Sequence, residues 1–291
     1  SFRATYNRSF STPTSNNLFL DILAGRTMIT PTVGYNVRAS GIPTTGFTFN
    51  NTCAGGLRGF CMYSPFAPGT QLPANGAALW DNLLVPLMLQ VPALAATLPL
   101  LGLNAATFAA IVGSPQPGEL TSTMLEFSQA GGAPFIPSAG PQGVNRLKAL
   151  AKQTWELGYT GLIGDKVRFD ISAYTDRYRN FIGPLKTLTP NIFLDGNSVA
   201  TYLVTRLAAV GIPLSVAQQL AAAVAPTLAS VPLGTIVPDQ RSNSDLMLSA
   251  RNYGQFSILG MDLGIEAHVT DQVTLSGSYS YVSDECYDAN N

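Results

Sequence analysis

The longest regular pattern of hydrophobic and polar positions lies near the C-terminus, between Gly254 and Asp284. Every odd position from Leu259 to Val269 is apolar, and the even positions between them are small or polar. The alternation pauses at Thr270-Asp271-Gln272 and resumes from Val273 to Tyr281. Because successive side chains of a strand point to opposite faces, this period of two predicts two strands joined in an antiparallel hairpin.

Two other parts of the chain repeat this pattern. Apolar and polar residues alternate before and after the short turn at Ile163-Gly164-Asp165-Lys166, and again near the N-terminus. We expect strands near residues 2–10, 153–163, 166–180, 254–270 and 272–284.

The connections between these strands fall into two classes. They are very short around Gly164-Asp165 and Asp271-Gln272, and very long over residues 11–150 and 181–250. Since neighbouring antiparallel strands run in opposite directions, all short turns lie at one end of the sheet and all long loops at the other. Outer-membrane β-barrels have this layout, with short periplasmic turns and long outer loops.

The long connections carry helical patterns. Residues 22–145 show no sustained strand alternation, so we expect a folded insertion with a small helical core, including a helix over Ala105–Ile111 capped by Asn104. In the second connection, residues 199–210 and 215–224 have helical spacing, with Ser215 as the expected cap and Pro226 as the expected end. Such an αα-hairpin packs on itself or on the first insertion, and association with a membrane is the alternative.

Composition narrows the class of protein. The net charge of −1 gives no reason to expect a nucleic acid partner. Charged residues make up 11% of the chain, against about 25% in ordinary soluble domains. This low charge fits a barrel that faces hydrocarbon, and it also fits a secreted β protein. Residues 83–103 are long enough for a membrane helix, but Pro86, Pro92 and Pro99 interrupt them.

The three cysteines suggest an oxidising environment. Cys53 and Cys61 flank the glycine-rich segment AGGLRGF, which could close into a small disulfide ring. The alternatives are two unrelated thiols or a partial metal site, and the single histidine, His268, lies far away in the sequence. Cys286 has no obvious partner in this chain.

Candidate chemistry is sparse, and we expect neither an enzyme nor a bound cofactor or metal. One histidine excludes any motif that needs two, and no Gly-x-Ser-x-Gly or phosphate-binding loop occurs. Asp262 and Glu266 share a face with His268, which suggests either an acid–base group or a hydrated lumen wall. We expect a polar, lumen-facing row that consists of Arg168, Asp170, Asp262, Glu266 and His268.

Three segments resemble TonB-dependent outer-membrane receptors. They are SFRATYNRSFSTPTSNNLFLD, WELGYTGLIGDKVRFDISAYTDRYRNFI and GMDLGIEAHVTDQVTLSGSYSYVSD, which occur in the order expected of that family and cover about a third of the chain. The resemblance implies a closed barrel of 22 strands around an N-terminal plug. On that map the chain is a late, C-terminal-side fragment of the barrel, without the plug. The two long insertions resemble no family that we can name.

The resemblance implies a function at the bacterial outer membrane. We expect a receptor that takes up a scarce nutrient such as a siderophore, a metal complex, a vitamin or an oligosaccharide. Its partners would be outer-membrane lipid, an unidentified small-molecule substrate and, through the plug, the energy-coupling complex of the inner membrane. The alternative is a structural or adhesive surface protein whose long outer loops bind other proteins, and a passive porin is a weaker option.

Overall fold

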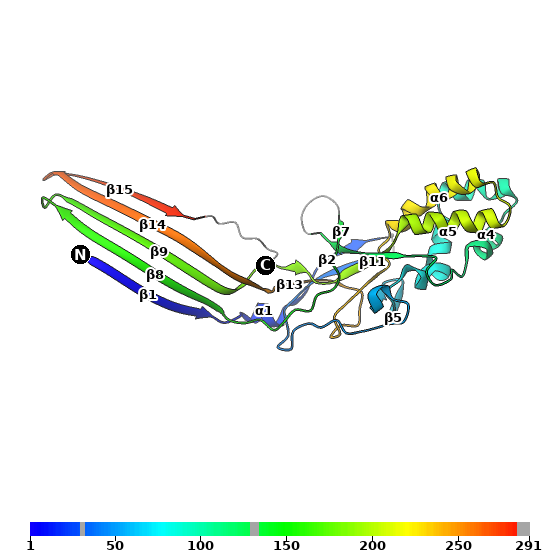
Figure 1. Cartoon of the computed structure of the whole chain (residues 1–291), viewed down its shortest axis with the longest axis horizontal. Coiled ribbons are helices and arrows are strands. Elements are labelled where there is room, and N and C mark those ends of the chain that lie inside the picture. The colour runs from blue at the N-terminus through cyan, green and yellow to red at the C-terminus, as the bar shows by residue number, and fades with distance from the viewer. Residues whose placement is uncertain (30–32, 129–133, 284–291) are drawn as a thin grey trace. The chain divides into compact units, whose positions relative to one another are not determined.

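The computed structural model of the chain describes residues 1–29, 33–128 and 134–283, and it is mostly β-structure (Figure 1). Strands account for 44% and helices for 25%, and the sheets are mainly antiparallel. The chain divides into two compact units. Unit 1 contains Ser1–Phe19, Arg146–Pro184 and Ala250–Asn291, and unit 2 contains Leu20–Asn145 and Leu185–Ser249.

Unit 1 is built on one sheet of five long strands. These strands are β1 (Phe2–Ser11), β8 (Leu150–Ile163), β9 (Val167–Ile182), β14 (Asn252–Thr270) and β15 (Val273–Val282). A short helix, α1 (Ser15–Phe19), follows β1. Each strand lies where the alternating pattern predicts one, and Asp284, the last residue of the predicted hairpin, lies outside the described residues.

The strand order in this sheet is β1-β8-β9-β14-β15, and every neighbouring pair is antiparallel. Within the described residues, β1 and β15 form the two edges, and the strands do not close into a barrel. The expected antiparallel β-structure with partly helical insertions is therefore confirmed at this coarser level.

Unit 2 contains two smaller sheets. The first has the order β10 (Lys186–Thr187), β13 (Leu246–Ser249), β3 (Gly34–Ser40) and β2 (Asp21–Met28), and its β13–β3 pair is parallel. The second has the order β5 (Ala67–Pro73), β4 (Cys61–Ser64), β12 (Gly234–Thr235), β11 (Pro190–Leu194), β6 (Ser122–Phe127) and β7 (Phe135–Pro137).

The helices of unit 2 come from both long connections. The first connection supplies η1 (Leu57–Gly59), η2 (Gly76–Leu79), η3 (Trp80–Leu84), α2 (Val85–Met88), α3 (Pro92–Thr97), η4 (Pro99–Leu101) and α4 (Ala105–Val112). The second supplies α5 (Gly196–Ala209) and α6 (Leu214–Ala229). Asn104 caps α4 in a reciprocal capping box with Thr107, as the sequence predicts.

One buried cluster joins the helices of the two connections. The indole of Trp80 and the hydroxyl of Tyr202 both donate hydrogen bonds to the Val112 carbonyl, at 2.7 and 2.9 Å. Their rings meet edge to face with centroids 5.3 Å apart. Helices α5 and α6 pack on each other, and they also contact α4 and α3 of the first insertion. The prediction that the αα-hairpin buries its apolar faces in this way is confirmed.

The first long connection contains several short strands, β2 to β7, although its sequence shows no sustained alternation and suggests short strands only over residues 30–49. Strand β2 does not alternate because nearly all of its residues are exposed, so neither face selects apolar side chains. Strand β3 does alternate, with Tyr35, Val37 and Ala39 buried. That period of two is present in the sequence and would have indicated a strand.

Two details of the predicted second helix are also wrong. Helix α6 begins one residue before Ser215, and the carbonyl of Pro213 accepts hydrogen bonds from the amides of Val216 and Ala217. Pro226 lies inside the helix rather than after its end. Proline removes only its own amide donor, and the Ser230 amide still donates to the Pro226 carbonyl, so the last turn persists.

The helical cluster predicts a stability difference within α5. Leu207 is 1% exposed, so Leu207→Ala should lower the free energy of unfolding of unit 2 by about 2–5 kcal/mol because it leaves a cavity. Val210→Ala, at the exposed end of the same helix, is the matched control and should cost less than about 1 kcal/mol. Urea unfolding monitored by Trp80 fluorescence measures both, and equal losses would contradict the assigned core.

Candidate functional site

The two faces of the five-stranded sheet differ sharply in chemistry. Strand register places Arg168 opposite Glu266, and Asp170 opposite Gly264. Since opposed residues point to the same face, these side chains share one face with Asp262 and His268. The structure therefore gathers all five predicted polar residues on one surface, which we call the polar face.

Most charges on the polar face are paired within it. Arg168 forms an ion pair with Asp170 at 3.1 Å, and the Thr160 hydroxyl donates to the same carboxylate at 2.5 Å. Lys152 pairs with Asp176 at 2.9 Å, and Arg3 pairs with Glu156. The Arg168–Asp170 pair lies within β9, whereas the contacts of Thr160, Lys152 and Arg3 cross between neighbouring strands and so help to hold the strands in register.

The histidine does not assemble an acid–base site with both carboxylates. His268 Nε2 lies 3.7 Å from Glu266 Oε1, and its Nδ1 lies 2.9 Å from the Thr274 hydroxyl. Asp262 is four residues from Glu266 along one strand, a separation of about 13 Å. The side chains of Glu266 and His268 are about half exposed. This geometry favours a hydrated wall, and no cluster of metal-binding side chains occurs among the described residues.

A shallow hollow lies on the polar face. Its lining includes Arg3, Asp170 and Asp262 together with hydroxyl groups, which belong to Thr160, Ser172, Ser278 and Ser280. The short residues Gly264, Ser278 and Ser280 on β14 and β15 leave this part of the polar face open. The hollow offers both hydrogen-bond donors and hydrogen-bond acceptors to a polar ligand or a polar polypeptide surface.

Glycines let large side chains lie flat on the sheet. A Cβ atom built on Gly260 would come within 2.1 Å of Tyr174 Cζ, the residue opposite it on β9. On the other face, a Cβ on Gly161 would come within 2.4 Å of the Phe169 ring. These aromatic rings cover backbone that the glycines leave bare, so the pairs act as steric locks between neighbouring strands.

The opposite face is a continuous apolar surface, which we call the apolar band. It contains large exposed side chains, among them Leu157 at 67% and Leu275 at 61% exposure. Two aromatic pairs cross from β1 to β8, Phe2 with Tyr159 and Tyr6 with Trp155, at centroid distances of 4.6 and 4.5 Å. The band extends along the strands through Ile163, Ile171, Ala173, Leu259, Met261, Leu263, Ile265, Val269 and Tyr279.

The apolar band ends at a defined row of residues. Tyr6 and Trp155 face each other, and the next row on the same face consists of Arg8, Gln153 and Arg177. An aromatic pair thus marks the boundary between an apolar and a polar zone. The sequence predicts the alternation on each strand. The register of β1 against β8, which only the structure shows, places the end of the band at the same level on both strands.

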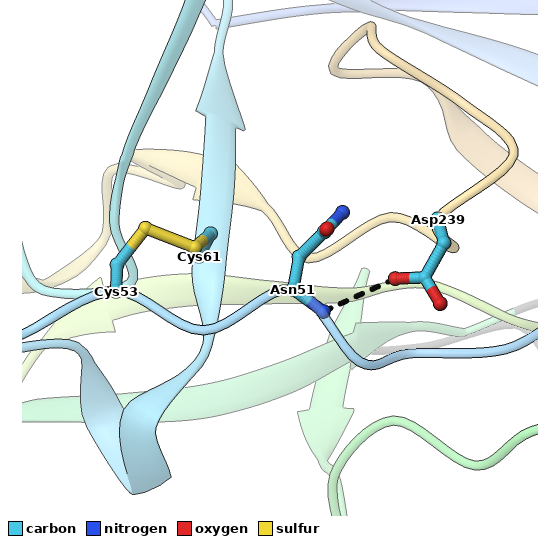
Figure 2. Close-up of a disulfide and its surroundings, with 4 residues drawn as sticks. All are labelled: Asn51, Cys53, Cys61 and Asp239. Atoms are coloured by element: carbon cyan, nitrogen blue, oxygen red, sulfur yellow. Dashed lines mark hydrogen bonds between the residues drawn. A yellow bond between two sulfur atoms is a disulfide. The ribbon is translucent and has the colours of Figure 1, made fainter.

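A second polar centre, in unit 2, was missed by the sequence analysis (Figure 2). The carboxylate of Asp239 accepts hydrogen bonds from the Thr48 hydroxyl at 2.6 Å and the backbone amide of Asn50 at 2.8 Å. It also accepts one from the backbone amide of Asn51 at 3.1 Å, which Figure 2 shows. The Cys53–Cys61 disulfide closes the adjacent loop, as predicted. Because about 190 positions separate Asp239 from its partners, no local sequence pattern indicates this contact.

Hydrogen bonding controls the acidity of Asp239. Partial burial acts to raise its pKa, but the donors of Thr48, Asn50 and Asn51 together stabilise the charged form more strongly. The net result is a pKa below the ordinary value of 3.8. The charged carboxylate therefore fastens residues 48–51 to the segment that leads into β13.

Comparison with known proteins identifies no relative: no family model, curated protein or solved structure matches the chain. Among the described residues, no individual helix has the length and apolar character needed to cross a membrane, and only the bent pair Gly76–Met88 and Pro92–Leu101 meets those criteria when taken together. The Cys286 thiol lies outside the described residues.

The Gly260–Tyr174 contact predicts a position-specific effect on unit 1. Gly260→Ala should lower its free energy of unfolding by about 1–3 kcal/mol because the new methyl group displaces the Tyr174 ring. Gly254→Ala on the same strand, where nothing lies within 4 Å, is the control. Urea unfolding of both variants, and of Gly260→Ala combined with Tyr174→Ala, provides the measurement. If Gly260→Ala costs as much stability in the Tyr174→Ala background as in the original protein, the contact is refuted.

Asp239 predicts an acid-sensitive component of stability in unit 2. A carboxyl group with a lower pKa in the folded state stabilises the fold above the unfolded pKa, and this contribution disappears as the pH falls through the folded pKa. Unit 2 should therefore lose stability below about pH 4. Asp239→Asn should cost about 1–3 kcal/mol at neutral pH and reduce that acid dependence. Thermal unfolding from pH 7 to pH 3 tests this, with Asp271→Asn in the exposed turn of unit 1 as the control.

Proposed function

We propose that this chain is part of an outer-membrane receptor of the TonB-dependent type, with its five-stranded sheet forming part of the barrel wall. In this proposal the receptor takes up a scarce nutrient: a siderophore, a metal complex, a vitamin or an oligosaccharide. One observation carries the proposal: the sheet exposes an apolar band on one face and a paired, hydroxyl-rich polar face on the other. Exposure to water is favourable for the polar face but not for the apolar band.

The extent of the apolar band supports contact with lipid. Along β8 it extends from Ile163 to Trp155, and along β14 from Val269 to Leu259. These lengths correspond to the roughly 9–11 residues that a tilted strand needs to cross the hydrocarbon core. The Tyr6–Trp155 pair next to Arg8 and Arg177 is typical of the aromatic girdle at a membrane interface.

The connections of unit 1 also support the proposal. The turn between β8 and β9 lies beside the turn between β14 and β15, because the His268 amide donates to the Lys166 carbonyl at 2.8 Å. Both short turns are therefore at one end of the sheet. The chain leaves the other end into the two long segments that make unit 2. This segregation is typical of outer-membrane barrels.

Under this proposal, the polar face belongs to the barrel lumen. Arg168, Asp170, Asp262, Glu266 and His268 form a hydrated wall there. Outer-membrane lipid covers the apolar band, and a plug encoded elsewhere in a longer protein connects the receptor to the energy-coupling complex of the inner membrane. The proposal assigns no catalytic role to any residue that the structure describes.

The alternative is an adhesive or structural surface protein on a barrel anchor. One observation favours it: the two long insertions fold together as a single unit with a shared core and a disulfide, which is a suitable scaffold for binding another protein. The sequence upstream of this chain separates the two functions. A plug domain with a coupling segment supports transport, whereas an N-terminus that leads directly into barrel strands contradicts it.

The lipid contact predicts different costs for the same charge on the two faces of β9. Phe169→Arg should lower the free energy of unfolding in lipid by about 2–4 kcal/mol if the residue lies near the bilayer midplane. Ser172→Arg, three residues along the same strand but on the polar face, is the control and should cost under about 1 kcal/mol. Reversible urea unfolding in lipid vesicles measures both, and equal costs would contradict the assignment of the faces.

A further inference from the structure

The helical part of unit 2 contains two long stretches without charge. Residues 82–118 and 207–238 include no Asp, Glu, Lys, Arg or His. They form α2, α3, η4, α4 and α6, and their exposed positions are occupied mainly by Ala, Pro, Gly, Ser, Thr and Gln. Surface helices of a soluble domain normally carry many charges, since about a quarter of all residues are charged. Contact with water alone does not explain this composition.

The most exposed apolar side chains of this region lie in turns. Leu100 in η4 is 84% exposed, Val210 at the end of α5 is 53% exposed, and Leu214 at the start of α6 is 56% exposed. Turns are usually built from polar residues, Gly and Pro. We call residues 98–103 and 210–214 the apolar turns.

The apolar turns are firmly anchored. Next to the exposed leucines, Leu101, Leu103 and Ile212 pack on the large buried cluster that also includes residues of α5 and α6. Helix α3, which immediately precedes the first turn, contacts α6, which immediately follows the second. Within unit 2, the α5–α6 turn lies at the end of the helix pair away from β11 (Figure 1). Anchored turns with exposed leucines are suited to inserting these side chains into an external apolar phase, because the leucines are not buried in the core of unit 2.

The missing side-chain types indicate what these turns contact. Protein interfaces depend on exposed Trp, Tyr and Arg, but the aromatic residues of the helices, Trp80, Phe108 and Tyr202, are all buried. Arg206, which lies just before the second uncharged stretch, is paired with Glu119 at 3.0 Å. Attraction to anionic lipid headgroups needs clustered Lys or Arg, and none occurs in the two stretches.

We propose that the apolar turns of unit 2 dock on a lipid bilayer whose surface carries no net charge. Leu100, Val210 and Leu214 enter the boundary between headgroups and acyl chains, and the uncharged helices behind them avoid the cost of desolvating charge. This interaction surface lies wholly within unit 2. It is additional to the proposed uptake function and does not depend on it.

A polarity-sensitive thiol fluorophore at the apolar turns tests the proposal. The full chain, with its disulfide intact and Cys286 replaced by Ser, carries the fluorophore at Leu100→Cys, at Leu214→Cys or, as a control, at Ile136→Cys. Ile136 is an apolar residue of unit 2 that is 40% exposed but lies in β7. Each protein is kept in lipid-free buffer with an amphipathic polymer, and phosphatidylcholine vesicles are then added.

We expect the fluorophore emission to shift to the blue at both turn positions, and this shift should not depend on salt. Brominated acyl chains should quench the fluorescence at these positions, and the emission at Ile136 should not shift. Replacing both Leu100 and Leu214 by Ser should weaken docking of the turns on the vesicles, measured from the blue shift of a fluorophore at Val210→Cys, by roughly tenfold or more for each leucine removed. No shift at the turns, an equal shift at Ile136, or a shift that requires anionic vesicles and disappears in salt would overturn the proposal. None of these outcomes bears on the barrel, because none probes unit 1.

Discussion

The exposed apolar band of the five-stranded sheet is the constraint on which the rest of unit 1 depends. A large aliphatic or aromatic side chain gains about 1.5–3 kcal/mol when it leaves water, and the band contains many that remain exposed within the described chain. A soluble protein does not tolerate an apolar patch of this extent without a partner. The steric locks at Gly161 and Gly260 and the cross-strand ion pairs Arg3–Glu156 and Lys152–Asp176 stabilise the strand pairing, but they leave the band uncovered. In our proposal hydrocarbon covers the band, which accounts for both its chemistry and its length.

Unit 2 is one folded body that is made from two insertions far apart in the sequence. The Val112 carbonyl accepts hydrogen bonds from Trp80 of the first insertion and Tyr202 of the second. Asp239 ties the end of the second insertion to residues 48–51, and the nearby disulfide limits the freedom of the loop that follows. These contacts make the insertions a rigid platform. Both proposed functions, ligand capture by a receptor and adhesion by a surface protein, would use such a platform.

The sequence predicted the parts of the fold that are governed by local periodicity. All five long strands, the Asn104 cap and the Cys53–Cys61 ring follow from spacing within short stretches. It failed where both faces of a strand have the same environment: β11 is buried on both faces and β2 is exposed on both, so neither alternates. The polar face was predicted strand by strand, but the pairing of Arg168 with Asp170 and the separation of Glu266 from His268 needed coordinates. Asp239 was missed because its partners are remote in the sequence.

The most direct test of the central claim is a cysteine scan along β14 from Leu259 to Val269, with a nitroxide label at each position of the protein in lipid vesicles. The account predicts that labels at odd positions, including Leu263, collide with oxygen dissolved in the bilayer. Labels at even positions, including Asp262, should instead collide with a water-soluble nickel chelate, which gives an accessibility profile with a period of two. A profile in which all positions are equally accessible from water, or in which the two faces are exchanged, would contradict the assignment of this sheet to a membrane wall.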